Sequence, residues 1–396
     1  MAEKRGVYRL IAKTLFGLED VLAAELSDLG ATDVKPLSRA VEFHGDKRLL
    51  YRANLWCRTA TRILKPIAVF HAGDGEELYK RVDRINWLRH LTAESTLAVD
   101  AVVSQSGLDN SLFVAQRTKD AIVDQFRKRF DKRPSVDLAN PDLRLNIYIH
   151  RDLATLSLDS SGEPLQRRGY RTEGGQAPLN EVLAAGILAL TEWDEISTLI
   201  DPMCGSGTFP IEAALKARRL APGLTRERFT FMNWKDYAPR LFRDVVEEAK
   251  TSALPNVPFE IVGIDKDARR IEEARANAQR AGVAENVRFE QDTFENHQPP
   301  PAPGTLIVNP PYGERLKVAD ITALYASLGD TLKKKYEGYD AFIFTGNHEA
   351  ARNIGLRASR RIPLYNGPME CRLLKFEMYR GSRKARKQPD AGEAES

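Results

Sequence analysis

The pattern of hydrophobic and polar residues changes along the chain and divides it into two parts. In the first 175 residues, short alternating stretches typical of strands are interspersed with helical patterns. From about residue 178, strand and helix patterns alternate regularly, which is typical of a parallel sheet with helices on both faces. The sequence therefore predicts an α/β part preceded by α+β structure.

The N-terminal part is expected to form a small α+β fold. Its predicted strands are residues 7–13, 41–43, 96–104, 143–152 and 154–161. Its predicted helices are residues 18–29, 49–64 and 111–130, the last with a buried stripe of Leu112, Ala115, Ile122, Val123, Phe126 and Phe130.

The C-terminal part is expected to form a doubly wound sheet. Its predicted strands are residues 198–202, 260–267, 287–292, 304–312 and 340–347. Its predicted helices are residues 178–193, 208–220, 268–282 and 324–336. A closing hairpin over 360–379, turning at Asn366 and Gly367, is expected at the sheet edge.

Composition is typical of a folded protein and does not identify a partner. The 396 residues, 42% of them hydrophobic, suggest two or three domains. The net charge of +4 lies in the first 175 residues, which hold 28 basic and 24 acidic residues against 31 of each in the remainder. This excess is too small to indicate nucleic acid without a motif.

Three widely separated cysteines, Cys57, Cys204 and Cys371, support neither a disulfide framework nor a zinc site. The N-terminus lacks a secretory apolar segment, and no stretch has the length of a membrane span. We therefore expect a cytoplasmic protein with no metal and no membrane partner.

A glycine-containing turn follows the first strand of the α/β part. Ligands of open α/β sheets bind at the carboxyl ends of the strands, where glycine permits close approach to the backbone. The turn matches neither the dinucleotide nor the P-loop pattern, and a turn needed only for packing is the alternative. Its candidate ligand-binding residues are Asp201, Pro202, Cys204, Gly205, Ser206, Gly207 and Thr208.

Two carboxylates end the next two predicted strands. Asp265 is placed to accept hydrogen bonds from ribose hydroxyls, and Asp292 from an adenine amine. Each is otherwise interpreted as a helix N-cap. Together with the glycine turn, they predict an adenosine-binding site.

The sequence Asn309-Pro310-Pro311-Tyr312 ends the fourth strand. The prolines stiffen the loop, and the Asn309 side chain and Pro310 carbonyl can accept hydrogen bonds from an exocyclic amine. Such acceptors favour the pyramidal amine that develops during transfer, and Tyr312 can stack on the base. These four residues are the predicted catalytic residues.

These motifs, with RRGYR at 167–171, APLNEVLAAGIL at 177–188 and TKDAIVDQFR at 118–127, resemble the THUMP-containing bacterial ribosomal RNA guanine-N2 methyltransferases, the RlmL-like family. The resemblance implies a class I methyltransferase domain, strand order 3-2-1-4-5-7-6, with S-adenosylmethionine as cofactor. It implies a ferredoxin-like segment at 1–68, a THUMP RNA-binding domain at 69–162, a catalytic domain at 163–380 and a disordered tail at 381–396.

The resemblance also implies roles for the site residues. Asp201, Gly205 and Gly207 would line the methionine moiety, Asp265 the ribose and Asp292 the adenine, while Asn309–Tyr312 hold a guanine. Because the sequence contains one catalytic domain, only one activity is expected. The methyl group would pass directly to guanine N2 without a covalent enzyme intermediate.

Basic residues in two segments are candidate RNA contacts. Those on the predicted helix 111–130 and just after it are Arg117, Lys119, Arg127, Lys128, Lys132 and Arg133, and those on the linker are Arg167, Arg168 and Arg171. A solvated helix face and an ordinary charged linker are the alternatives. The expected partner is 23S ribosomal RNA or an assembly intermediate. Methylation of transfer RNA guanine, methylation of DNA adenine N6, and a non-catalytic RNA-binding assembly factor remain alternative functions.

Overall fold

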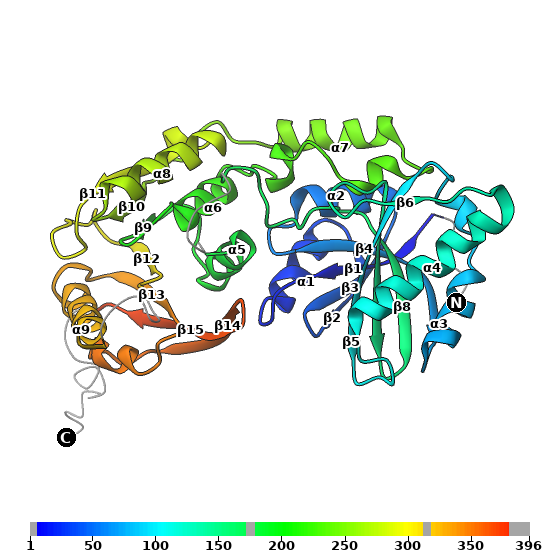
Figure 1. Ribbon diagram of the computed structural model, residues 1–396. Coiled ribbons are helices and arrows are strands. Elements are labelled where there is room, and N and C mark those ends of the chain that lie inside the picture. Colours follow the sequence, from blue (N-terminus) through cyan, green and yellow to red (C-terminus); the bar gives the residue numbers. More distant parts are fainter. Residues whose placement is uncertain (1–5, 172–178, 312–317, 380–396) are drawn as a thin grey trace, which may run out of the picture. The chain divides into compact units, whose positions relative to one another are not determined.

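The computed structural model describes residues 6–171, 179–311 and 318–379. The chain forms two compact units, each with its own sheet (Figure 1). The N-terminal unit adds residues 180–186 and 218–255 to the residues up to 171, and the C-terminal unit contains Leu179, 187–217 and the residues from 256 onward. The predicted start of the catalytic domain at residue 163 therefore differs from the division into compact units.

The N-terminal unit contains an eight-stranded sheet in the order β2-β3-β1-β4-β8-β7-β5-β6. The strands are β1 Tyr8–Lys13, β2 Thr32–Leu37, β3 Ala40–Gly45, β4 Arg62–His71, β5 Thr96–Ser104, β6 Ser135–Val136, β7 Leu143–His150 and β8 Leu153–Asp159. Antiparallel pairing of β4 with β8 joins the two predicted α+β segments into one sheet. The predicted boundary between residues 68 and 69 falls inside β4.

The helices of this unit are α1 Glu19–Asp28, α2 Lys47–Trp56, α3 Gly75–Asp83, α4 Ser111–Phe130 and α7 Pro239–Thr251. The prediction of one helix over 49–64 is wrong, because α2 ends at Trp56 and the backbone is extended at Cys57. The β-branched Thr61 and Ile63 favour the strand that follows. The predicted stripe of α4 is also partly wrong, since Leu112 and Phe130 are exposed while Val114, Thr118 and Ala121 are buried.

Aromatic packing explains why residues 218–255 belong to the N-terminal unit. The Tyr51 ring lies 4.5 Å from the Phe231 ring and 5.5 Å from the Phe242 ring, measured between centroids. Val245 and Ala249 of α7 belong to the same core as the strands of the eight-stranded sheet. Burial of these side chains stabilises the unit across a long sequence separation.

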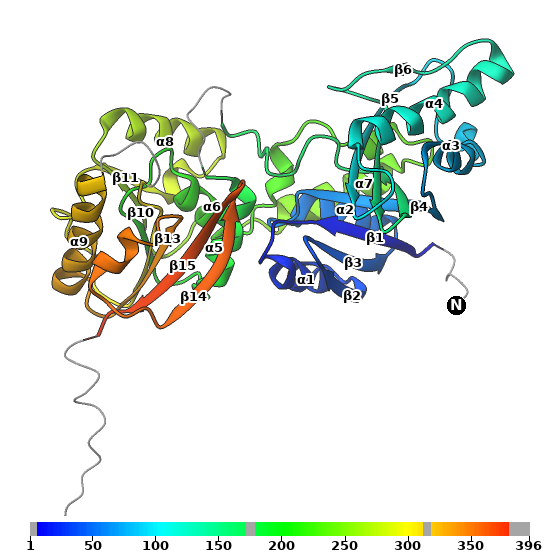
Figure 2. The same ribbon diagram turned by 60° about the horizontal axis from the view of Figure 1, so that its bottom comes forward.

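The C-terminal unit contains a seven-stranded sheet in the order β11-β10-β9-β12-β13-β15-β14, which confirms the predicted order (Figure 1). Figure 2 shows β13, β15 and β14 side by side. The strands are β9 Thr198–Asp201, β10 Ile261–Asp265, β11 Arg288–Gln291, β12 Gly304–Val308, β13 Tyr339–Thr345, β14 Arg360–Asn366 and β15 Met369–Glu377. β15 is antiparallel to β13 and β14, as the predicted closing hairpin requires. The carboxyl ends of β9, β10, β11 and β12 lie at one edge.

The remaining α-helices are α5 Glu181–Leu190, α6 Thr208–Ala217, α8 Ala268–Arg280 and α9 Val318–Lys335. The short 3-10 helices are η1 Trp87–Arg89, η2 Pro222–Thr225, η3 Thr230–Asn233, η4 Ala284–Asn286 and η5 Ala350–Ile354.

Helices cover both faces of the seven-stranded sheet. Tyr325 and Leu328 of α9 share a core with Ile200 of β9. The adjacent Leu199 is fully buried on the other face, so helices cover both faces as the alternation predicts. No helix among the described residues is long and apolar enough to cross a membrane.

Candidate active site

A cavity of about 180 Å³ lies at the carboxyl ends of β9 and β12. Six of its lining residues were predicted from the sequence to belong to the site: Asp201, Cys204, Gly205, Ser206, Thr208 and Asn309. Four further lining residues, Leu179, Met203, Phe209 and Arg270, were not selected. Of these, Arg270 follows a strand-ending carboxylate at the start of a helix, a position from which the sequence could have suggested it.

The loop between β9 and α6 has the left-handed backbone that glycine favours. Gly205 has φ +53° and Gly207 has φ +84°. A Cβ atom at Gly207 would lie 2.9 Å from the Phe289 ring and 3.0 Å from the Ala274 Cβ, whereas one at Gly205 would meet nothing within 4 Å. Gly207 is therefore needed for packing of the loop on α8 and β11, and Gly205 leaves open space beside the cavity.

This difference gives a stability prediction. We expect Gly207→Ala to lower the free energy of unfolding by about 2 to 3 kcal/mol, because it combines a strained φ with overpacking. Gly205→Ala is the matched control and should cost about 1 kcal/mol, since only the backbone term applies. Urea denaturation of both variants measures the difference. Equal costs would contradict the packing role of Gly207.

Asp265 fixes the same loop from β10. Its Oδ2 accepts a hydrogen bond from the Gly205 N–H at 3.0 Å, and its Oδ1 accepts one from the Asp267 N–H at 3.0 Å. The N-cap of α8 is Asp267 rather than Asp265. A carboxylate has further acceptor positions, so Asp265 can hold the loop and still accept from a ligand hydroxyl.

Asp292 follows β11, and its main chain is tied to the end of β10. The Asp292 N–H donates to the Asp265 carbonyl at 3.2 Å, and its own Oδ1 accepts from the Thr293 N–H. Neither Asp265 nor Asp292 lines the 180 Å³ cavity itself. They lie at the ends of neighbouring strands, as the sequence predicts.

Asp201 is a buried carboxyl at the cavity wall. It is 2% exposed, and its Oδ1 accepts a hydrogen bond from the Met203 N–H at 3.2 Å. Burial, reinforced by the nearby Asp265 charge, raises the pKa of Asp201 well above its usual value. A cationic ligand group beside this carboxyl would stabilise its charged form.

Cys204 is buried beside Asp201. Burial, with smaller contributions from Asp201 and Asp265, raises the pKa of its thiol well above the usual value. The thiol is therefore protonated at neutral pH, which makes it a poor nucleophile.

Asn309 directly follows β12 and carries a polar side-chain atom that has no partner among the described residues. Its Oδ1 is buried and accepts no hydrogen bond among the described residues. Leaving such an acceptor unpaired costs about 1 to 3 kcal/mol, which a ligand N–H would offset. Pro310 is buried and Pro311 is exposed, while Tyr312 lies outside the described residues.

Most predicted RNA contacts on α4 are paired with acidic residues. Arg117 bonds to Glu76, Lys119 to Asp120 and Arg127 to Asp124, and Lys128 lies 3.9 Å from Asp83. Lys132 and Arg133, just after the helix, are exposed. These ion pairs favour a solvated helix face over RNA contact as the role of the basic side chains on α4.

The linker arginines differ from one another. Arg168 is 2% exposed and donates to the carbonyls of Leu165 and Arg58, so we correct its role from RNA contact to structural support. Arg171 pairs with Glu181 at 3.2 Å, and Arg167 is exposed beside Glu163. The predicted tail, 381–396, lies outside the described residues. Among residues that the structure describes, no group of three or more His, Cys, Asp or Glu side chains is arranged to hold a metal ion.

Models of known protein families match three parts of the chain. Residues 168–375, just over half of the chain, match the RMKL-like methyltransferase domain. The chain belongs to this methyltransferase family. Residues 9–64 match the RlmL ferredoxin-like domain and residues 72–159 the THUMP domain, so both predicted N-terminal domains of this RMKL-like methyltransferase are confirmed.

Individual relatives agree with the family. A ribosomal RNA large subunit methyltransferase K/L of Syntrophotalea carbinolica is 47% identical over 91% of this chain and 52% of its own length. The chain thus spans about half the length of that relative. A putative RNA methyltransferase of Synechocystis is 41% identical over 92% of this chain and 95% of its own. The crystal structure of SMU.472, a putative methyltransferase complexed with SAH, is 32% identical with a TM-score of 0.86, covering 96% and 100% of the two chains.

Proposed function

We propose that this RMKL-like methyltransferase uses S-adenosylmethionine to methylate the exocyclic N2 amine of a guanine in 23S ribosomal RNA. The observation that carries the proposal is the unpaired Asn309 Oδ1 beside a cavity shared with the glycine loop. An acceptor at this place can hold an amine next to the bound cofactor.

The residues around the cavity fit the cofactor. Asp201 can accept from the cofactor's amino group, while the open space at Gly205 allows close approach to the backbone. Asp265 and Asp292 can accept from the ribose and from adenine, respectively. When bound, S-adenosylmethionine supplies the methyl group; SMU.472 was crystallised with the demethylated product, SAH.

Asn309 and Pro310 would act on the target amine. The lone pair of an exocyclic amine is delocalised into its ring, and acceptors on its two N–H groups favour the pyramidal, nucleophilic form. The Pro310 carbonyl is bonded to the nitrogen of Pro311, which has no N–H, so this peptide unit offers the amine only an acceptor. Tyr312 would orient the base by stacking.

An RNA substrate is supported by the N-terminal unit and by the relatives. A THUMP domain, which we predict to bind RNA, precedes the proposed catalytic residues. The relatives named above include a ribosomal RNA methyltransferase and a putative RNA methyltransferase. Because a paired guanine places its N2 amine in the helix groove, the target base would be unpaired or flipped out.

Purified protein tests the proposal with deuterated S-adenosylmethionine. It is incubated separately with unmodified 23S ribosomal RNA, transfer RNA and DNA, and the nucleosides are analysed by mass spectrometry. We expect labelled N2-methylguanosine from ribosomal RNA. Label in transfer RNA alone or in N6-methyladenine would favour an alternative substrate, and absence of label with bound cofactor would favour a non-catalytic factor.

A further inference from the structure

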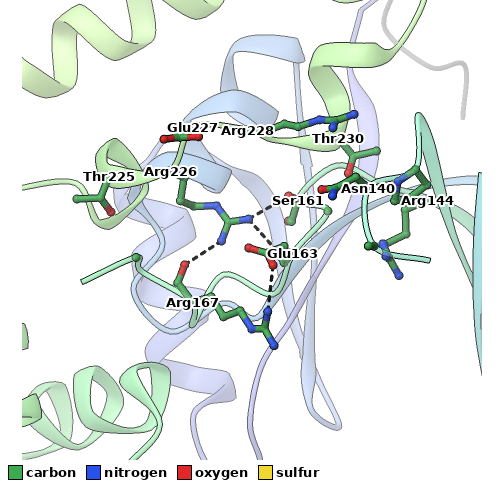
Figure 3. A pocket seen from close by; sticks show the side chains of 14 residues that line it. Asn140, Arg144, Ser161, Glu163, Arg167, Thr225, Arg226, Glu227, Arg228 and Thr230 are labelled. Carbon is green, nitrogen blue, oxygen red and sulfur yellow. Dashed lines mark hydrogen bonds and ion pairs between the residues drawn. The ribbon is translucent and has the colours of Figure 1, made fainter. Parts of the chain in front are cut away.

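A second cavity lies in the N-terminal unit and shares no lining residue with the candidate active site. It has a volume of about 490 Å³ and is lined by three segments, 139–144, 161–169 and 225–230. Four arginines line it, Arg144, Arg167, Arg226 and Arg228, against two glutamates, Glu163 and Glu227 (Figure 3). The lining therefore carries excess positive charge, which favours an anionic ligand.

Arg226 is a partly buried cation whose hydrogen-bond acceptors are main-chain carbonyls, with the carboxylates of Glu163 and Asp159 nearby. Its two terminal nitrogens donate to the carbonyls of Ser161, Glu163, Pro164 and Arg167, as Figure 3 shows in part. Its Nε is buried and has no partner among the described residues. Burial lowers the pKa of Arg226 to about 10. An anion in the cavity would compensate this buried charge.

Two other arginines of the cavity have donor capacity to spare. Arg144 pairs with Asp100 at 2.9 Å and donates to the Leu138 carbonyl, but its buried Nε has no partner among the described residues. Arg228 is exposed. The α4 cations differ, since those from Arg117 to Lys128 face carboxylates.

The face of β7 that carries Arg144 is covered at Asn146, which is 5% exposed, and becomes exposed again at Tyr148. Arg144 and Tyr148 point to the same face, because side chains alternate along a strand. The Tyr148 and His150 rings lie parallel, 6.3 Å apart with an interplanar angle of 2°. Tyr148 is 42% exposed, and its neighbour in register, Val102 of β5, is 41% exposed.

The opposite face of the same strands is buried. Leu145 and Ile147 of β7 lie in one core with Ile122 and Phe126 of α4 and Leu78 of α3. These helices pack on the side opposite Tyr148, so they leave the Tyr148 end of the aromatic face exposed. Exposed aromatic rings on a sheet, next to guanidinium groups, provide base stacking and phosphate binding for single-stranded RNA.

We propose that the Arg226 cavity binds a backbone phosphate of the substrate RNA and that Tyr148 stacks on a base of the same unpaired strand. The inference rests on the proposed function for the identity of the nucleic acid. The strand would run along β7, since Arg144 and Tyr148 are separated by about 13 Å of extended chain. Phosphate contacts would set the position of the RNA, and stacking would require unpaired bases.

Substituting Arg226 would also disturb the fold, because Arg226 holds the 161–167 segment through four hydrogen bonds. Exposed residues of the proposed site are therefore substituted instead. We expect Arg228→Gln to weaken binding of a fluorescein-labelled oligouridylate several-fold and to reduce the salt dependence by about one phosphate contact. Tyr148→Ala should weaken binding about ten-fold, whereas Tyr148→Phe, which keeps the ring, should bind like the unmodified protein. Fluorescence anisotropy over a salt series measures all three.

Lys128→Gln is the control, because Lys128 lies on α4 and pairs with Asp83. It should bind the oligouridylate like the unmodified protein. Unchanged affinity and salt dependence in both Arg228→Gln and Tyr148→Ala would overturn the inference, as would a larger loss in Lys128→Gln.

The same preparations separate this inference from the proposed function. Methyl transfer to 23S ribosomal RNA by the unmodified protein, with Arg228→Gln and Tyr148→Ala equally active and equally able to bind RNA, would reject the cavity site alone. RNA binding that depends on Arg228 and Tyr148, with no N2-methylguanosine formed, would reject the proposed reaction while supporting the cavity site.

Discussion

Replacing Asn309 with alanine is expected to lower the rate of methyl transfer at least about 100-fold while leaving the affinity for S-adenosylmethionine within a few-fold of its original value. The buried Asn309 Oδ1 has no partner among the described residues, so it is available to a ligand. The substitution removes the acceptor that we propose favours the reactive amine geometry. Single-turnover transfer to 23S ribosomal RNA and calorimetric titration with the cofactor measure the two effects separately.

Asn296→Ala is the matched control for this substitution. Asn296 is exposed in the same unit, and only its main-chain carbonyl is used as an acceptor, by Lys335 and Gln298. We expect unchanged transfer and unchanged cofactor affinity. Near-normal transfer by Asn309→Ala would contradict the assigned role of Asn309, whatever the substrate base.

The second large effect is expected at Asp201, where function and stability should change in opposite directions. Asp201→Asn should abolish measurable S-adenosylmethionine binding, since it removes the negative charge proposed to meet the cofactor's amino group. The same change should raise the free energy of unfolding at pH 7 by about 1 to 2 kcal/mol, because it removes a buried carboxylate. Asparagine keeps the acceptor for the Met203 N–H.

The sign of the pH dependence follows from the raised pKa of Asp201. A carboxyl whose pKa is higher in the folded than in the unfolded state favours folding while protonated. This contribution is complete below the unfolded value, about 3.9, and is lost as the pH rises through the folded pKa. The stability advantage of Asp201→Asn should therefore grow with rising pH and disappear below about pH 4.

Asp194 provides a control of opposite sign. Burial acts to raise the pKa of Asp194, but hydrogen bonds from Ser197 and Ile196 outweigh it and lower the pKa below its usual value. Its charged form therefore favours folding, and Asp194→Asn should lower stability at pH 7. Thermal denaturation across pH measures both variants. A loss of stability in Asp201→Asn that does not vary with pH would contradict the burial argument.

The catalytic unit was predictable from sequence because each strand ends in a recognisable residue. Asp201, Asp265 and Asn309 mark the carboxyl ends of β9, β10 and β12. Parallel pairing then brings these ends to one edge, which is why local motifs sufficed to predict a common site. The strand order came from the family resemblance and is confirmed by the pairing.

The N-terminal unit was less predictable because its contacts are distant in sequence. The residues that pack on Tyr51 come from 231–242, and nothing local indicates this pairing. The Arg226 cavity could not be predicted for the same reason, because the three segments that line it are distant from one another in sequence. Arg168 was wrongly predicted to contact RNA, because the sequence of a basic linker does not show which of its arginines is buried.

The most direct test of the central claim is mass spectrometry of 23S ribosomal RNA and transfer RNA from cells with and without the gene. We expect loss of the gene to remove N2-methylguanosine from one position in 23S ribosomal RNA, and the active gene, but not the Asn309→Ala variant, to restore it. Unchanged N2-methylguanosine in ribosomal RNA, with a loss in transfer RNA or of N6-methyladenine in DNA, would contradict it.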